Sequence, residues 1–174
     1  MDKKLYVNAD NQVIYDELAD SDTDEFINDA TLTFTVLRKV ATDGVMTAAS
    51  TTLTSLIAPF VAGDVGKAIL VRGAGEQRED LRTTIATYVD ADEVTLTVAA
   101  STTVSAAIVE VSIPNAKDVV MDYELSSDGR YVGILEDTAP LRAGETYRIE
   151  VSITAAGTQD FRRVEVPAEY RRYR

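Results

Sequence analysis

Apolar and polar residues alternate along several short segments of this chain, which is the pattern of β-strands with one buried face. In residues 30–36, ATLTFTV, apolar side chains alternate with threonines. In residues 147–153, YRIEVSI, they alternate with charged and hydroxyl side chains. The same reasoning predicts strands over 68–73, 83–89, 93–98, 107–113, 121–125, 130–135 and 161–166. Because no segment has a long helical period, the pattern predicts an all-β fold.

Turn-forming residues separate the predicted strands. Asp128-Gly129 supplies a residue suited to positive φ between 121–125 and 130–135, so these segments are expected to form a hairpin. Residues 90–92, Asp-Ala-Asp, predict a second hairpin. Near the start, KLYV and QVIY predict a third hairpin around residues 8–11.

The middle of the chain has a different texture from its ends. Residues 46–116 are rich in Thr, Ala, Ser and Val and contain their own turns and alternating strands. The flanking residues 1–45 and 117–174 together have the size of an immunoglobulin-like domain, about 100 residues. We therefore predict a discontinuous immunoglobulin-like β-sandwich (1–45 and 117–174) with a small β domain (46–116) inserted in a loop after Lys39.

One tyrosine supports the sandwich prediction. Tyr147 follows Leu141 by six positions, with Gly144 between them, at the start of a predicted strand. This spacing resembles a tyrosine corner, in which the phenol hydrogen-bonds to backbone a few residues upstream. The alternative is that Tyr147 is an ordinary core residue of its strand.

Composition excludes several classes of function. The chain has no cysteine, histidine or tryptophan, which excludes disulfides and thiolate metal sites and removes the commonest general base. A net charge of −12 disfavours binding to nucleic acid. The sequence has no apolar run of about 20 residues and no secretory signal, so no membrane partner is expected.

Two stretches resemble sites of known chemistry but lack essential residues. Residues 59–75 contain Gly66-Lys67, but Val61 and Ala68 stand where a phosphate-binding loop needs Gly and Ser or Thr. Residues 20–31 have acids in the first positions of a calcium loop, but Glu25 replaces the required Gly and Thr31 the bidentate Glu. A looser calcium site and an exposed acidic loop remain as alternatives there.

The carboxylate pairs Asp90/Asp92 and Glu136/Asp137 are predicted to lie in solvated turns, where pKa values stay ordinary. The many hydroxyls have no histidine to activate them. We therefore predict no enzymatic activity, no catalytic residue, no cofactor and no metal.

The charge of the chain is unevenly distributed. Residues 1–45 carry ten acids and four bases, whereas residues 161–174 carry five arginines and two glutamates. The last strand is expected to end at Pro167, or Pro167 to mark a sheet edge. The tail residues Tyr170, Arg171, Arg172, Tyr173 and Arg174 are then predicted to dock on a protein partner. The alternative is a solvated tail.

Two parts of the sequence carry patterns that occur together in known families. Phe60, the stretch GDVGKAI (63–69), GAG (73–75) and TTIATYVDADEVTLTVAASTTVSAA resemble a small β module of tailed-phage tail fibres and tailspikes. The flanking INDAT (27–31), DGRYVGIL and LRAGETYRIEV resemble an immunoglobulin-like family of phage structural proteins. In such a module Asp64 would cap a short turn, Gly66 would adopt positive φ, Lys67 would lead into a strand and Phe60 would anchor the turn.

The resemblance implies a non-enzymatic structural component of the virion, assembled in the host cytoplasm. It would form homo-oligomers and contact other virion proteins at the head–tail neck or connector, on the capsid or on the tail. A receptor- or carbohydrate-binding module of a tail fibre is the alternative. A hydrolase ranks last.

Overall fold

The structure, a computed structural model, describes residues 4–171 and is built from β-strands. Within these residues there are twelve strands and two one-turn 3-10 helices. The strands are β1 (Leu5–Tyr6), β2 (Asn11–Tyr15), β3 (Thr31–Met46), β4 (Thr52–Thr54), β5 (Ala68–Val71), β6 (Leu81–Asp90), β7 (Glu93–Leu96), β8 (Val104–Ser112), β9 (Val119–Tyr123), β10 (Tyr131–Leu135), β11 (Thr146–Ala155) and β12 (Thr158–Glu169). The helices are η1 (Ala62–Asp64) and η2 (Glu76–Arg78). The all-β prediction is confirmed, and no helix in the described part has the length and apolarity needed to span a membrane.

The chain divides into two compact units. Unit 1 comprises Met1–Val36 and Ile113–Arg174, and unit 2 comprises Leu37–Ser112. Unit 2 begins earlier in the chain than the predicted 46–116, and a loop after Lys39 is wrong, because β3 continues through Lys39 to Met46. Asp43-Gly44 has the appearance of a turn, yet Gly44 lies in the strand opposite Ala107. A Cβ at Gly44 would stand 2.5 Å from Val109 Cγ2, so glycine is required here for close packing.

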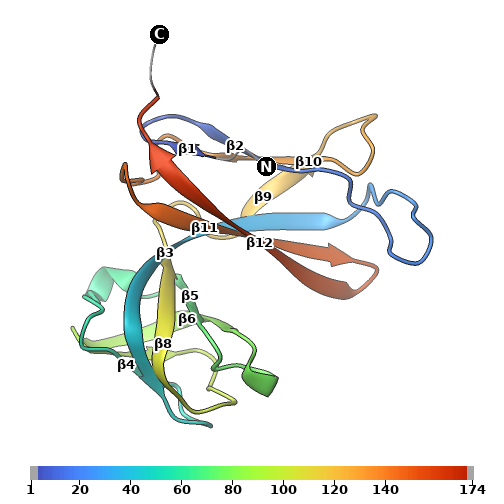
Figure 1. The fold of residues 1–174 in the computed structure, drawn as a ribbon. Coiled ribbons are helices and arrows are strands. Elements are labelled where there is room, and N and C mark those ends of the chain that lie inside the picture. Colours follow the sequence, from blue (N-terminus) through green and yellow to red (C-terminus); the bar gives the residue numbers. More distant parts are fainter. Residues whose placement is uncertain (1–3, 172–174) are drawn as a thin grey trace. The chain divides into compact units, whose positions relative to one another are not determined.

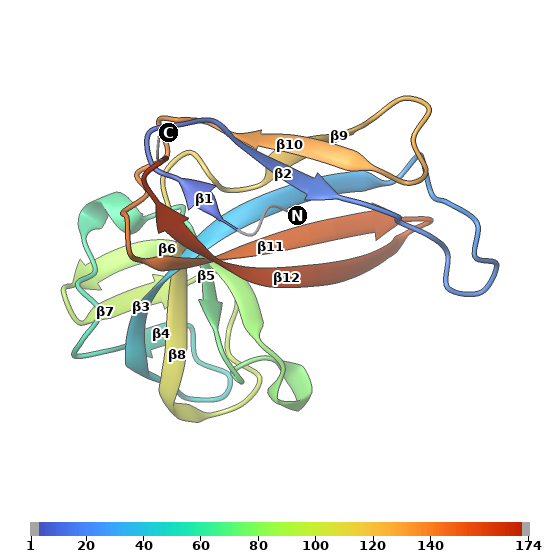
Figure 2. The same cartoon turned by 45° about the horizontal axis from the view of Figure 1, so that its top comes forward.

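Unit 2 is a closed barrel of six strands, counted over its described residues (Figures 1 and 2). The pairing runs β3–β4–β7–β6–β5–β8 and returns to β3, always antiparallel. Closure leaves no free sheet edge around the ring, which small β domains otherwise expose. Inward-facing residues fill the interior, including Leu53, Ile69, Val71, Ile85, Val94 and Val109.

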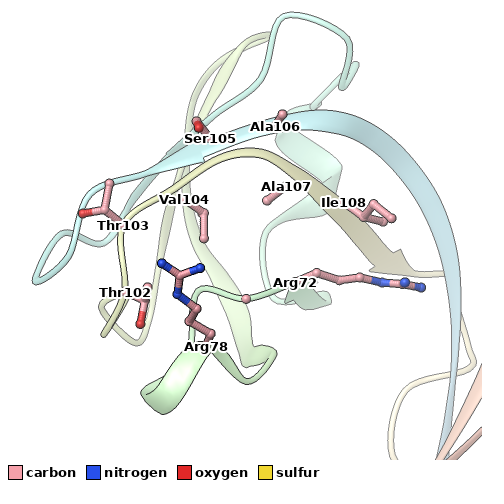
Figure 3. Close-up of a pocket in the computed structure, with 10 residues that line it drawn as sticks. Arg72, Arg78, Thr102, Thr103, Val104, Ser105, Ala106, Ala107 and Ile108 are labelled. Atoms are coloured by element: carbon pink, nitrogen blue, oxygen red, sulfur yellow. The ribbon is translucent and has the colours of Figure 1, made fainter.

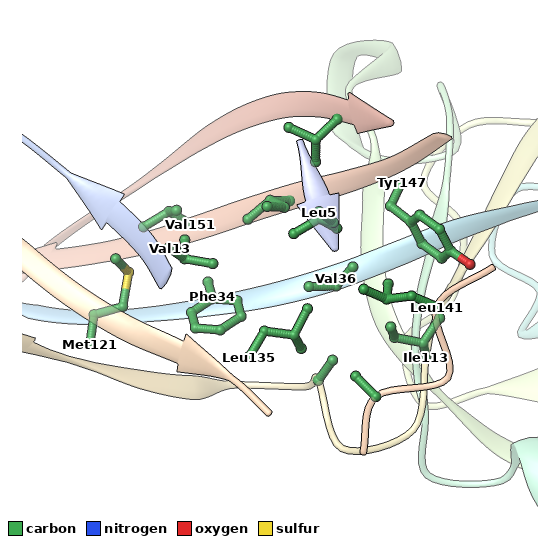
Figure 4. Close-up of a cluster of buried hydrophobic side chains, with 14 of the residues drawn as sticks. Leu5, Val13, Phe34, Val36, Ile113, Met121, Leu135, Leu141, Tyr147 and Val151 are labelled. Carbon is green, nitrogen blue, oxygen red and sulfur yellow. The ribbon is translucent and has the colours of Figure 1, made fainter. Parts of the chain in front are cut away.

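Unit 1 is built from the other strands and the first half of β3. The strand order is β1–β12–β11–β3, and β3 continues through β9 and β10 to β2. Figure 4 shows the core, where side chains from β2, β9 and β10 meet side chains from β3 and β11. Phe34, Val36, Leu135 and Val151 have no exposed surface there.

The predicted N-terminal hairpin around residues 8–11 is wrong. β1 pairs in parallel with β12, and β2 pairs antiparallel with β10, so the two segments belong to different strand pairs. The Asn11 side chain accepts from Tyr6 N (2.6 Å) and donates to Tyr6 O (3.0 Å) and Ala9 O (2.7 Å). Because this amide takes both backbone groups of Tyr6, β2 is held away from pairing with β1.

Several local predictions are confirmed in unit 1. Gly129 has φ of 64°, and β9 and β10 form the expected hairpin. The Tyr147 phenol oxygen accepts from Arg142 N at 2.8 Å, which is the upstream backbone bond expected of a tyrosine corner.

Pro167 does not end the last strand, because β12 continues to Glu169. Pro167 instead lies beside the two residues that pair with β1, where no donor is required of it.

Candidate functional site

Unit 2 has a groove on its surface (Figure 3). It has a volume of about 520 Å³. Its walls are the continuous run of residues 102–108 together with Arg72, Gly73 and Arg78. We call this feature the 102–108 groove. It follows a single segment of chain, of which residues 104–108 belong to β8.

The groove exists because the seam between β5 and β8 opens. At one end Arg72 N donates to Ile108 O at 3.0 Å, and at the other Thr102 N donates to Ala74 O at 3.2 Å. Between these two bonds the β5 side contributes only Gly73, and η2 begins beyond them at Glu76. On the other side of β8 the pairing with β3 shifts register on both sides of Gly44–Ala107, and Ala106 has φ of 59°. Bulges of this kind bend a strand away from its neighbour.

Two arginines flank the groove, and they differ in their partners. Arg72 forms an ion pair with Glu110 at 3.4 Å, and the Glu110 side chain is only 6% exposed. Arg78 makes no ion pair with any residue that the structure describes. In Figure 3 its guanidinium lies near Val104. Gln77 and Arg78 have φ of 51° and 66°, a strained left-handed pair that directs the chain around this corner.

A second feature of unit 2 is an exposed apolar loop, residues 55–65, which connects β4 with η1 and β5. Leu56 is 84% exposed, Ile57 60%, Val61 54% and Val65 48%. Ala58 and Phe60 of the same loop are buried in the barrel core. Because alternate residues are anchored, the exposed apolar side chains are held outside the core.

Asp43 fixes the start of the apolar loop. Its carboxylate accepts from the Ser55 hydroxyl and from Leu56 N, the latter at 2.9 Å. The Ser55 hydroxyl in turn accepts from Ala58 N at 2.9 Å. The bond from Ser55, followed by that from Leu56, lowers the pKa of Asp43 below its ordinary value. The loop is therefore tied to β3 while Leu56 projects into solvent.

The segment around Gly66-Lys67 has the structural roles that the phage-module resemblance implied. Asp64 Oδ2 accepts from Val61 N at 2.9 Å and so caps η1. Lys67 Nζ lies 2.6 Å from Asp64 Oδ1, and Gly66 has φ of 84°. Phe60 is 3% exposed, and β5 begins directly after Lys67. The Lys67 ammonium group therefore forms an ion pair with the Asp64 carboxylate of the same turn.

The acidic loop 20–31 is closed by its own backbone. Asp20 Oδ1 accepts from Asp22 N at 2.8 Å and from Thr23 N at 3.0 Å. These bonds lower the pKa of Asp20, that from Asp22 most strongly. Ala19 and Phe26 form an antiparallel bridge at the base of the loop. Asp20 Oδ1 therefore serves as a turn cap within this loop.

The predicted carboxylate pairs lie in exposed turns. Asp90 Oδ1 accepts from Asp92 N at 2.9 Å within the β6–β7 turn. Glu136 and Asp137 gather with Asp10, and the closest carboxylate oxygens of all three lie within 4.8 Å of one another. Asp10 Oδ1 also accepts from Asp137 N at 2.9 Å, a bond that links two distant segments of unit 1.

The described part of the predicted C-terminal site lies close to β1. Tyr170 is 64% exposed, and the Arg171 guanidinium stacks over the Tyr6 ring at 5.1 Å. Lys4 and Glu169 form an ion pair at 3.0 Å nearby. Arg172, Tyr173 and Arg174 lie outside the described residues. Docking of these five residues on a partner stays a prediction.

Sequence reasoning missed both the groove and the apolar loop. The groove depends on where two strands separate, which no local pattern records. The loop had a signal, since Leu56 and Ile57 are adjacent apolar residues that cannot both face inward in an alternating pattern. Comparisons with protein-family models, curated proteins and solved structures find no match to this chain.

Proposed function

We propose that this chain is a non-enzymatic structural protein of a tailed bacteriophage particle. It assembles in several copies against other virion proteins at the head–tail neck or connector, or as an accessory on the capsid or tail. Its localisation is the virion, after assembly in the host cytoplasm. Unit 1 is proposed to be an immunoglobulin-like β-sandwich interrupted by the barrel of unit 2.

The exposed apolar loop is the observation that carries this proposal. Soluble domains seldom hold several large apolar side chains outward in one short segment unless another molecule covers them. Leu56 and Ile57 are held by the Asp43 and Ser55 bonds and cannot fold back into the filled core. A surface fixed in this way favours a standing protein–protein contact, as an assembly subunit requires.

The immunoglobulin-like assignment of unit 1 has its own support. Strands β2, β9 and β10 contribute to the same core as β3 and β11, and Tyr147 makes its bond to upstream backbone. The resemblance of DGRYVGIL and LRAGETYRIEV to phage structural proteins points in the same direction.

Mass spectrometry of purified particles tests the proposed function directly. We expect the chain in particles at a fixed copy number, with a multiple of six or twelve for a neck protein and hundreds for a decoration or tube protein. Its absence from particles would refute the proposal.

Two changes test which surface makes the contact. The double variant Leu56→Ser/Ile57→Ser should fold normally but enter particles poorly, because apolar contact area is lost. Leu125→Ser is the matched control, since Leu125 is 85% exposed and lies in unit 1.

A chain ending at Glu169 tests the predicted tail site and spares β12. Normal incorporation of the truncated chain would exclude residues 170–174 from the contact.

A receptor- or carbohydrate-binding module of a tail fibre is a second candidate function. The observation that favours it is the 102–108 groove flanked by Arg78, which makes no ion pair with a described residue, since binding sites are concave and hold a few placed polar groups. Saturable binding of host-surface glycans to the groove, together with a fibre location in particles, would favour this candidate.

A further inference from the structure

We propose that the apolar loop of unit 2 (residues 55–65) is a docking site for residues 170–174 of a second copy of this chain. We call residues 170–174 the basic segment. The loop of one copy receives the segment of the next, and repetition of such a heterologous contact builds a ring or a filament. This inference rests on the proposed structural function and deepens it, because it names what covers the apolar loop.

The apolar loop presents a fixed apolar surface. Leu56 and Ile57 project into solvent, whereas Ala58 and Phe60 of the same loop are buried in the barrel core. An anchored loop loses little conformational freedom when a partner covers it, which favours binding. The surface therefore suits a partner that brings its own apolar or aromatic groups.

An acidic turn lies beside the apolar loop. Ser55 N donates to Asp92 O at 2.9 Å. Phe60 N donates to Ala91 O at 3.1 Å, so the loop is bonded at two points to the β6–β7 turn. The side chains of Asp90 and Asp92 in this turn are exposed. The apolar surface is therefore bordered by carboxylates, which favour a partner that carries bases.

The carboxylates beside the loop are not neutralised by nearby bases. Lys67, the first base after the loop in the sequence, forms an ion pair with Asp64 at 2.6 Å, so these two charges offset each other. None of Asp43, Asp90 and Asp92 makes an ion pair with a residue that the structure describes. The border of the loop therefore keeps a negative charge.

The basic segment has the complementary chemistry. Its sequence, Tyr-Arg-Arg-Tyr-Arg, holds three bases, two aromatic rings and no acid, and no other five-residue window of the chain holds three bases. Tyr170 is 64% exposed directly after β12. Tyrosine rings can cover apolar side chains while guanidinium groups pair with carboxylates. A contact between copies also supplies one basic segment for every loop.

Sedimentation velocity of the full chain tests this proposal. We expect self-association that rises with protein concentration and weakens when NaCl is raised from about 50 mM to about 500 mM. Leu56→Ser/Ile57→Ser and a chain ending at Glu169 should each weaken self-association at least about tenfold, because each removes one side of the contact. Leu125→Ser is again the control and should associate as the unchanged protein does.

Mixing the two defective chains sharpens the test. Leu56→Ser/Ile57→Ser keeps the basic segment, and the chain ending at Glu169 keeps the apolar loop. Each alone should stay monomeric. Their equimolar mixture should form a heterodimer and nothing larger, because only one loop and one segment remain functional in it.

A second pair of variants tests the charge of the border. Asp90→Asn/Asp92→Asn removes two charges but keeps an oxygen at residue 90 to accept from the backbone N of residue 92. Self-association should weaken about fivefold. Asp22→Asn/Asp24→Asn is the matched control, because both acids are exposed in unit 1. The amide NMR spectrum of each variant reports whether it remains folded.

Three results would overturn the proposal. They are a full chain that stays monomeric at every concentration, self-association that the chain ending at Glu169 retains, and defective chains that do not combine. Retention by the truncated chain with loss in the loop variant would mean that two loops meet instead. If the chain is present in particles but stays monomeric in solution, only this inference fails. If the chain is absent from particles, the structural function itself fails.

Discussion

Gly129 is held by two independent constraints. Its φ of 64° lies in the left-handed region, which a side chain makes costly. A Cβ at this position would also stand 2.4 Å from Leu18 O and 2.7 Å from Leu18 N. The close approach exists because Leu18 N donates to Gly129 O at 3.0 Å, while Gly129 N donates to Asn28 Oδ1 at 3.1 Å. One residue thus joins the β9–β10 turn to the 18–28 segment.

Gly129→Ala should lower the free energy of unfolding more than Gly157→Ala. Both glycines have positive φ, so both substitutions carry a backbone cost of about 1–2 kcal/mol. Only Gly129 also meets neighbouring backbone, which adds about 1–3 kcal/mol, whereas nothing lies within 4 Å of a Cβ at Gly157. Urea unfolding of both variants measures the difference. Equal losses would show that the segment of Leu18 moves aside at no cost.

At the scale of the element, the β11–β12 hairpin has its register reinforced by charge. Arg148 lies opposite Glu165, and Glu150 lies opposite Arg163. Both pairs make ion pairs, at 3.5 Å and 3.3 Å. A slip of two residues would place Arg148 opposite Arg163 in one direction, or Glu150 opposite Glu165 in the other. Like charges directly opposite are unfavourable, so the sequence disfavours both neighbouring registers of the same face.

A double-mutant cycle measures this contribution. Glu150→Ala and Arg163→Ala should be coupled by about 1 kcal/mol, at the upper end for ion pairs with solvent access, because the Glu150 side chain is only 10% exposed. The exposed pair Asp160–Arg162 is the control, with an expected coupling near zero. Thermal or urea unfolding of the four chains of each cycle gives both values. Coupling of the same size in the two cycles would contradict the role of burial.

At the scale of the molecule, unit 2 is inserted into unit 1 between Val36 and Ile113, which are hydrogen-bonded to each other. Val36 N donates to Ala116 O at 2.8 Å, and Ile113 N donates to Val36 O at 3.0 Å. The two ends at which unit 2 is inserted are therefore neighbours. Each unit has its own buried cluster, and Ile113 and Ala116 belong to that of unit 1.

Replacing Leu37–Ser112 with a short Gly/Ser turn should leave unit 1 folded, because both ends already meet. Dispersed methyl NMR signals and a cooperative unfolding transition are the expected results. The matched control removes residues 46–116 instead. That deletion takes Ile113 and Ala116 from the core and leaves most of the second half of β3 without its β8 partner, so it should abolish cooperative unfolding. Folding of the control but not of the first chain would contradict the observed boundaries.

Much of this fold was predictable from alternation and turn residues. Segments 30–36, 107–113 and 147–153 are strands and Gly129 makes its turn, because each depends on residues close in sequence. Periodicity fixes which face of a strand is buried. It says nothing about which strand lies at each edge, since every residue offers the same backbone donor and acceptor.

Strand partners were therefore decided only by the tertiary structure. The segments KLYV and QVIY pair with β12 and β10, and Asp43-Gly44 lies inside β3, because distant strands supplied the partners. The closed barrel and the 102–108 groove follow from the same choice of edges. The sequence by itself determined most of the strands, their buried faces and the turn at Gly129. Closure, insertion points and concave surfaces depended on long-range backbone pairing, which local sequence does not encode.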